Sequence, residues 1–203
     1  MKRSLRLKVM VKTILLFYYS TINNNTEILN SNSSNTSELS YHDFIDWLVG
    51  FTDGDGSFSI VKQGKTTFTF VYSIYLHKDD TPLLINIQKR LCMGKVYEGK
   101  HFSSFTITKK KEEVRKLISI FKDHPFNTSK NLNFSCWAEA FELYTNKIGV
   151  INVTPKILSL KNEMNKKRIK FIQPIGHTIK VSPYWFLGFV EAKQAGFFFS
   201  CKK

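Results

Sequence analysis

Cysteine and long apolar runs are both scarce in this 203-residue chain, and each scarcity excludes a class of protein. The three cysteines, Cys92, Cys136 and Cys201, lie far apart and form no C-x-x-C pair. They support neither a disulfide framework nor a cysteine-based zinc site, and they favour a reducing compartment. The apolar stretch Val9–Tyr19 is short and interrupted by Lys12, so it is not expected to span a bilayer.

Acidic residues are also in short supply. The chain has 16 Asp and Glu against 30 Lys and Arg, which leaves a formal net charge of +14. Such a surplus indicates an anionic partner, with nucleic acid as the first expectation and an anionic membrane surface as the second. Aromatic residues make up 14% of the chain, which argues against a disordered basic tail. The length fits one domain, or one domain and a fragment.

The first 40 residues differ in composition from the rest. Residues 1–19 carry basic side chains and no acid, and the first acid is Glu27. This pattern fits an organellar presequence, and it fits equally a remnant of upstream reading frame. Residues 21–40 form an Asn/Ser/Thr tract with little to bury, which predicts a disordered linker. We therefore expect a presequence-like or disordered extension over residues 1–40.

The chain is organised around residues 47–56, which read WLVGFTDGDG. A capping-box spacing that begins at Ser40 predicts the start of a helix. This helix is apolar on nearly every side, so it has to be buried. Gly50 and Gly54, four residues apart, would let a second helix approach backbone to backbone. Asp55 then follows where the helix ends, which leaves a carboxylate at the tip of a buried element.

Periodicity predicts the elements that follow. From Ser57 the apolar residues alternate, so each strand has one apolar and one polar face. The order helix, hairpin, helix, hairpin, helix describes an α+β fold with an antiparallel sheet. The expected elements are strands over 57–63 and 67–77, a helix from Thr81 that Gly94 ends, a hairpin that turns at Gly99, and helices over 110–121, 131–146 and from Thr154 through Arg168.

The segment Leu48–Gly56 resembles the nine-residue signature of the LAGLIDADG homing endonucleases, and the flanking Trp47 and Phe58 also resemble that family. An EF-hand loop that begins at Asp53 is excluded, because Phe58 would stand where the loop needs glycine. The plain alternative is a buried helix followed by an Asp-Gly turn. The resemblance implies a LAGLIDADG domain over residues 41–168, in which four antiparallel strands form a saddle over DNA.

The resemblance also implies a site. Asp55 would bind the catalytic metal, expected to be Mg²⁺ because hard cations take oxygen ligands. Lys130, which follows Pro125 at the family's spacing, would be the active-site lysine, and His77 would belong to the polar water network. A surface lysine and a solvent-facing strand histidine are the ordinary alternatives for these two. The implied activity is metal-dependent, site-specific hydrolysis of double-stranded DNA.

Nucleic-acid contacts are expected on two surfaces. The basic cluster Lys166, Lys167 and Arg168 is predicted to be either a solvated basic surface or a set of contacts to phosphate groups. The outward strand residues would carry the sequence specificity implied by the resemblance. These are Ser59, Val61, Gln63, Thr69, Ser73, Tyr75, Ser104 and Thr106.

Residues 184–192 look like a degenerate second copy of the signature. Gly188 and Ala192 correspond to Gly50 and Gly54, so a close helix pair is expected. The metal-binding position is Lys193, which is a poor metal ligand. We expect a linker over residues 169–183 and a truncated second motif helix over 184–203. The side chains expected to be buried against the first motif helix are Phe186, Leu187, Phe189 and Val190.

The sequence leaves several hypotheses open about the assembly and the activity of the chain. Cleavage of both strands needs two carboxylates, so the chain would homodimerise through the Gly50 and Gly54 flank, work with a missing half, or be a monomer that nicks or is inactive. An RNA-binding intron maturase and a DNA-binding regulator are the alternatives to a nuclease. The abundance of Phe, Lys, Asn and Ile suggests an AT-rich genome, and a fungal mitochondrion would fit the family resemblance.

Overall fold

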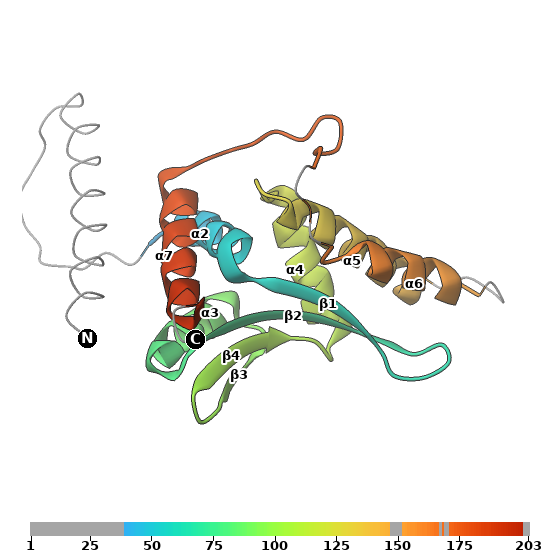
Figure 1. The fold of residues 1–203 in the computed structure, drawn as a ribbon, viewed down its shortest axis with the longest axis horizontal. Coiled ribbons are helices and arrows are strands. Elements are labelled where there is room, and N and C mark those ends of the chain that lie inside the picture. Colours follow the sequence, from blue (N-terminus) through green and yellow to red (C-terminus); the bar gives the residue numbers. More distant parts are fainter. Residues whose placement is uncertain (1–38, 147–151, 167, 169–170, 201–203) are drawn as a thin grey trace, which may run out of the picture. The chain divides into compact units, whose positions relative to one another are not determined.

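The computed structural model describes residues 39–146, 152–166, 168 and 171–200 (Figure 1). The presequence or linker expected over residues 1–40 lies almost wholly outside this range. The predicted α+β order of helix, hairpin, helix, hairpin, helix is confirmed. The elements are α2 (Tyr41–Asp55), β1 (Ser57–Lys62), β2 (Phe68–His77), the 3-10 turn η1 (Lys78–Asp80), α3 (Thr81–Leu91), β3 (Lys95–Glu98), β4 (Phe102–Ile107), α4 (Lys111–Asp123), α5 (Lys130–Thr145), α6 (Thr154–Glu163) and α7 (Pro183–Ser200).

The four strands form one antiparallel sheet in the order β1-β2-β4-β3. Ser57 pairs with Ser73, and Ser73 pairs in turn with Thr106. Residues that pair directly across strands share a face. The apolar face packs under helices α2, α4 and α5, which lie above the sheet in Figure 1.

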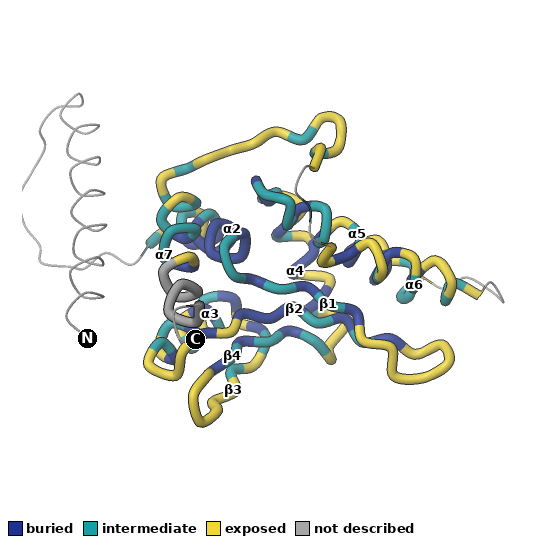
Figure 2. Tube along the Cα trace, in the orientation of Figure 1, coloured by how far each residue is buried: buried dark blue, intermediate teal, exposed yellow. Residues whose placement is uncertain are grey.

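Helix α2 begins as the capping pattern predicts, because Ser40 Oγ accepts a hydrogen bond from the Asp43 N–H at 3.1 Å. Its middle is buried on every side, as Figure 2 shows. Thr52 Oγ and the Tyr72 hydroxyl, both fully buried, lie 2.7 Å apart and share a hydrogen bond. This bond joins the helix to the central strand β2 and satisfies two hydroxyls in the core.

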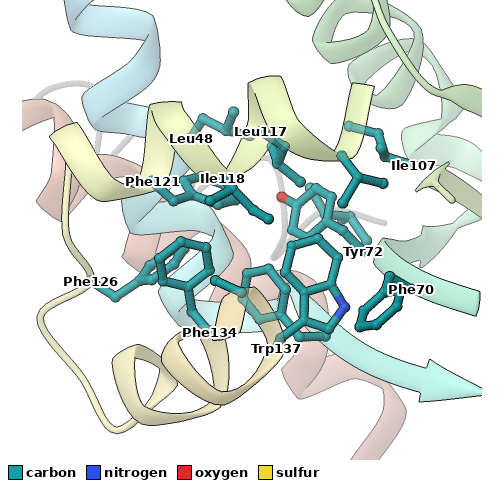
Figure 3. Packing of buried hydrophobic residues seen from close by; sticks show 14 of the residues in the cluster. Leu48, Phe70, Tyr72, Ile107, Leu117, Ile118, Phe121, Phe126, Phe134 and Trp137 are labelled. Carbon is teal, nitrogen blue, oxygen red and sulfur yellow. The ribbon is translucent and has the colours of Figure 1, made fainter. Parts of the chain in front are cut away.

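An aromatic cluster fills the space between β1, β2, α4 and α5 (Figure 3). The Phe121 and Phe126 rings lie 4.7 Å apart, and the Phe58 and Trp137 rings lie 5.2 Å apart. Trp137 also donates through Nε1 to the Ser59 carbonyl at 3.1 Å, so the buried indole has its hydrogen-bond partner. The cluster therefore fixes α5 on the edge strand β1, and with it the start of α5.

Two predicted helix ends are wrong. Helix α3 ends at Leu91, because Cys92 adopts the left-handed conformation (φ 53°) before Gly94 is reached. Helix α6 ends at Glu163 and does not extend through the basic cluster. Asn165 is left-handed (φ 55°), and its N–H donates to Asn133 Oδ1 at 3.0 Å. Asparagine tolerates this conformation better than most residues, so it can end a helix as glycine does.

Two further findings concern composition. Cys92 and Cys136, the cysteines within the described residues, are free thiols. Among the helices that the structure describes, none has the length and apolarity needed to cross a bilayer.

Candidate active site

Asp55 is the last residue of α2, and it lies between two lysine side chains. Lys130, the first residue of α5, donates through Nζ to the carbonyl of Gly56. Lys193 of α7 donates through Nζ to the carbonyl of Gly54 at 2.8 Å. The two lysines therefore bind the backbone on either side of a partly buried carboxylate.

Burial controls the titration of this group of charges. It raises the pKa of Asp55 above the ordinary 3.8, although Lys130 and Lys193 both act to lower that pKa. Burial also lowers the pKa of Lys130 below the ordinary 10.5. The positive charge of Lys193 lowers this pKa further, whereas the negative charges of Asp53 and Asp55 act to raise it. A carboxyl and an amine with pKa values shifted toward neutrality are typical of sites that move protons or bind metals.

Asp53 holds the loop that carries Lys130. Asp53 is buried, with 4% of the residue exposed. Oδ2 accepts from the Asn127 N–H at 2.8 Å, and Oδ1 accepts from the Thr128 hydroxyl at 2.6 Å. Burial raises the pKa of Asp53, although these hydrogen bonds favour the ionised form. The carboxylate thus anchors the segment that leads into α5.

Residues of the expected linker over 169–183 form hydrogen bonds with the same loop. Asn127 donates through Nδ2 to the Lys180 carbonyl at 2.7 Å, and its Oδ1 accepts from the Lys180 N–H at 2.9 Å. Gln173 donates through Nε2 to the Thr128 carbonyl at 2.9 Å. The described part of this segment therefore helps to fix the loop beside Lys130.

A cavity of about 300 Å³ opens between the end of α2, the start of α5 and the side of α7. Its lining combines Lys130 and Lys193 with Asp53 of α2, so charged groups of both signs surround the cavity. The lining residues are Asp53, Gly54, Thr128, Ser129, Lys130, Asn133, Phe189 and Lys193.

Helix α7 packs directly on α2, and the two helices lie side by side in Figure 1. A Cβ added at Gly50 would overlap the Trp185 carbonyl, and one added at Gly188 would overlap the Trp47 carbonyl. A Cβ at Gly54 would lie 2.5 Å from the Ala192 Cβ. The structure thus brings together the small residues that the sequence pattern singled out.

The two helices are related by an approximate two-fold axis, and their tryptophans show it. Trp47 of α2 donates through Nε1 to Glu191 Oε2 at 2.9 Å. Trp185 of α7 donates through Nε1 to Asp53 Oδ2 at 3.1 Å. Each tryptophan therefore bonds the carboxylate that stands at the matching position of the other helix.

The same correspondence assigns a counterpart to Asp55. The pairs Gly50 with Gly188 and Gly54 with Ala192 make Lys193 the equivalent of Asp55 in the second helix. Lys193 is exposed, and its Nζ reaches back to the Gly54 carbonyl. The helix pair is therefore symmetric in its packing and asymmetric in its charge.

The expected burial of Phe186 is wrong, since it is 53% exposed. Two residues from Gly188, it lies roughly 200° round the helix from the contact face. Leu187 and Val190 are partly buried. Phe189 is also partly buried, and its ring stacks on Trp185 at 5.1 Å.

His77 lies at the end of β2, and its side chain is 47% exposed. Its Nδ1 accepts from the Asp79 N–H at 3.4 Å and lies 3.3 Å from Asp79 Oδ2. The structure therefore pairs His77 with η1 and shows it as a solvent-facing residue at the rim of the sheet.

The outward face of the sheet carries most of the predicted polar residues in accessible positions. Tyr75 and Tyr97 flank Ser104 and are 57% and 53% exposed. Ser73 is the exception, because it is 5% exposed. It lies in β2 and pairs with Ser57 of β1 on one side and with Thr106 of β4 on the other. The residues that are exposed or partly exposed are Ser59, Val61, Gln63, Thr69, Tyr75, Ser104 and Thr106.

The basic cluster after α6 is engaged within the chain. Lys166 pairs with Glu163 at 2.8 Å. Arg168 donates through its guanidinium to Asn133 Oδ1 at 2.8 Å. Because Asn133 also lines the cavity, Arg168 lies one residue away from the site. Lys167 lies outside the described residues.

The sequence did not predict the residues that hold the loop beside Lys130 in place. The sequence pattern gave Asp53 no role, and nothing in it pointed to Thr128 or Asn127. The available signal was an acid on an otherwise apolar helix, since an ionised group in such a place needs partners. Those partners lie 74 to 132 residues along the chain, so no local pattern could name them.

Comparisons with known proteins agree with this geometry. Residues 48–141 match a family model described as LAGLIDADG endonuclease. A Saccharomyces cerevisiae protein named "Uncharacterized mitochondrial protein RF1" is 30% identical over 179 residues, which cover 87% of this chain and 37% of the relative. A Schizosaccharomyces pombe protein named "Probable intron-encoded endonuclease Cox1-I1b" is 30% identical over 169 residues, which cover 79% of this chain and 42% of the relative. The chain thus spans about two fifths of the length of these curated relatives.

Solved structures show the same fold. The LAGLIDADG meganuclease I-AabMI, bound to uncleaved DNA, superimposes with a TM-score of 0.62 at 28% identity, over 73% of this chain and 56% of that chain. The homing endonuclease I-TnaI superimposes with a TM-score of 0.53 at 26% identity, over 64% of this chain and 90% of that chain.

Proposed function

Because residues 48–141 of this chain belong to the LAGLIDADG endonuclease family, we propose that the chain is a metal-dependent DNA endonuclease of the intron-homing kind that cuts one strand of its target. The observation that carries the proposal is the helix pair in which Asp55 and Lys193 occupy equivalent positions. Relatives named as intron-encoded and mitochondrial support an intron origin and a mitochondrial location. Similarity to a meganuclease bound to DNA supports double-stranded DNA as the partner.

Asp55 is the residue that would hold the metal. It is partly buried at a helix end and exposed enough to meet a ligand. A hard cation such as Mg²⁺ needs one or two carboxylates when substrate phosphate and water complete its shell, so a single carboxylate fits one such ion. When bound, the ion would stabilise charge on the attacking and leaving oxygens of the phosphodiester.

Lys130 is the residue proposed to act beside that carboxylate. Its pKa is lowered mainly by burial, so it exchanges a proton more readily than a surface lysine. Asp53 acts as a positioning residue, because it binds the loop at Thr128 and so sets where Lys130 stands. The exposed polar side chains of the sheet, with His77 at its rim, would orient the DNA over the site.

The restriction to one strand follows from charge. A second metal site would need a carboxylate where Lys193 stands, and an ammonium group repels a cation and offers it no lone pair. Lys193 can still contact phosphate, as lysines do in nucleic-acid sites. One competent half-site would convert supercoiled DNA into an open circle and leave the complementary strand intact.

A plasmid assay tests the proposal. The substrate is a supercoiled plasmid that carries the DNA flanking the intron, joined without the intron. The assay contains Mg²⁺ on the order of 10 mM, because a partly hydrated Mg²⁺ ion held by one carboxylate binds weakly. We expect the open-circular product to accumulate, and Asp55→Asn to abolish it while DNA binding persists. Glu112→Gln, an exposed carboxylate in the first turn of α4, is the matched control and should nick like the parent.

Three outcomes would overturn the proposal. Linear product that appears as fast as the open circle would mean that both strands are cut. Nicking that survives Asp55→Asn would mean that the site lies elsewhere. Binding to the intron RNA that is tighter than binding to the duplex, with no nicking, would favour the maturase alternative.

A further inference from the structure

A second group of metal-ligating side chains lies at the opposite end of α2. His42, Asp46 and His124 each offer one ligand atom, and these atoms all lie within 4.8 Å of one another. His42 and Asp46 come from the first turns of α2, and His124 caps the end of α4. Four residues apart on a helix, His42 and Asp46 share one face, and this face meets α4.

Two of the three side chains, Asp46 and His124, already lie at the separation expected of ligands to one ion. His124 Nδ1 and Asp46 Oδ1 lie 3.2 Å apart, and their side chains are 27% and 21% exposed. The His42 and His124 rings lie 5.5 Å apart and meet at 63°. The side chain of His42 is 73% exposed, so it is free to rotate toward the other two.

The donor set selects a different class of metal from the Asp55 site. Two imidazoles and one carboxylate suit Zn²⁺ and its first-row neighbours, and three such ligands leave positions for water. Around a zinc ion the ligand atoms lie roughly 3.3 Å apart, as bond lengths of about 2.0–2.1 Å in a tetrahedron require. The Asp46 and His124 pair has that separation, and a rotation of His42 would complete the set.

The two sites are also separated in space. Asp46 and Asp55 are nine positions apart on the helix, which amounts to about 14 Å along its axis. An ion at one end of α2 therefore shares no ligand with an ion at the other end.

We propose that His42, Asp46 and His124 form a binding site for a divalent transition-metal ion of the zinc type, and that the bound ion joins the start of α2 to the end of α4. This site does not take part in DNA cleavage. Its effect is on the stability of the motif helix, because an ion that binds the folded chain alone stabilises it.

The test measures Zn²⁺ binding by calorimetry to the full chain that carries Asp55→Asn, so that the tip of α2 does not contribute. We expect one ion per chain with a dissociation constant below about 10 μM, a raised melting temperature on adding zinc, and no displacement by millimolar Mg²⁺. Co²⁺ should produce the visible absorption of a nitrogen- and oxygen-ligated ion.

Three variants make the test decisive. His42→Asn and His124→Asn should each weaken zinc binding at least about tenfold, as losing one of three ligands requires. His101→Asn, an exposed histidine between β3 and β4, is the control and should leave binding unchanged. His42 is exposed enough that its replacement should not disturb folding, so it serves if His124→Asn fails to fold. Zinc binding that is absent at 100 μM, or equal in His42→Asn and the parent, would overturn the proposal.

Discussion

Asp53 and Asp55 lie two residues apart on one helix, and their surroundings assign them different roles. Asp53 is buried, and backbone, hydroxyl and indole donors saturate its carboxylate. Asp55 is partly buried, and the charges of Lys130 and Lys193 beside it act to lower its pKa. A carboxylate that is fully hydrogen-bonded within the chain supports structure, whereas a partly exposed carboxylate beside two cationic groups is suited to bind a metal ion.

Replacing Asp53 with Asn should therefore damage the site indirectly. The amide would present N–H donors to the Asn127 N–H or the Trp185 indole, so buried donors would lose their acceptor. We expect the free energy of unfolding to fall by about 2–4 kcal/mol, and nicking to be lost with it. Chemical denaturation would measure the first effect. Unchanged stability in Asp53→Asn would show that these hydrogen bonds contribute nothing net.

Replacing Asp55 with Asn should have the opposite effect on stability. Burial raises the pKa of Asp55 in the folded chain, so between the ordinary value of 3.8 and the raised value the folded chain holds more protons than the unfolded chain. The free energy of unfolding of the parent therefore falls as pH rises through that window. Asn does not ionise, so the variant should melt higher than the parent at pH 7.

The control for this experiment is pH itself. The difference in melting temperature between parent and Asp55→Asn should shrink as the pH falls through the window, because the parent carboxyl becomes neutral. A difference that stays constant from pH 7 to pH 3.5 would contradict the assignment to Asp55.

At the scale of elements, the sequence predicted helix α2, but it predicted only some of the elements that pack against α2. The apolar surface of α2 and the Gly50 and Gly54 spacing indicated a buried helix with a close neighbour, and α7 fills that place. The end of α6 could not be predicted, because Asn165 is held by the side chain of Asn133. The burial of Ser73 depends on neighbours in two other strands.

The same distinction explains which residues of the candidate site the sequence could indicate. Asp55 follows from its place at the end of a local pattern. Lys130 follows from the family spacing, and its Nζ does reach the end of α2. The role of Asp53 depends on donors from α7 and from the loop before α5, which only the tertiary structure brings together.

Packing of the helix pair predicts a sharp difference between two glycines. At Gly50 a methyl group would overlap the backbone of Trp185, which has little freedom to move. At Gly64 a methyl group would meet Thr67 at 3.6 Å, an ordinary contact. Gly50→Ala should cost about 3 kcal/mol or more, and Gly64→Ala should stay within about 0.5 kcal/mol. Equal denaturation midpoints would show that the helices separate easily.

At the scale of the whole molecule, the charge surplus predicts how the chain binds DNA. With a net charge of +14, binding should be dominated by phosphate contacts. Neutralising about six phosphates would weaken binding on the order of 10³-fold between roughly 50 and 200 mM salt. Fluorescence anisotropy with a labelled duplex would measure the slope. An affinity independent of salt, or a preference for anionic vesicles over DNA, would contradict a phosphate-binding surface.

The docking of α7 predicts the oligomeric state. A homodimer formed through α2 would need the flank that α7 covers at Gly50 and Gly54, and a two-fold contact would present the same surface from both copies. Opening that flank would also break the hydrogen bonds from Trp47 and Trp185. We therefore expect sedimentation velocity to show a 23.6 kDa monomer across micromolar concentrations. A dimer that Gly50→Ala dissociates would mean that α7 leaves its place in solution, and such a dimer would bring two Asp55 carboxylates together.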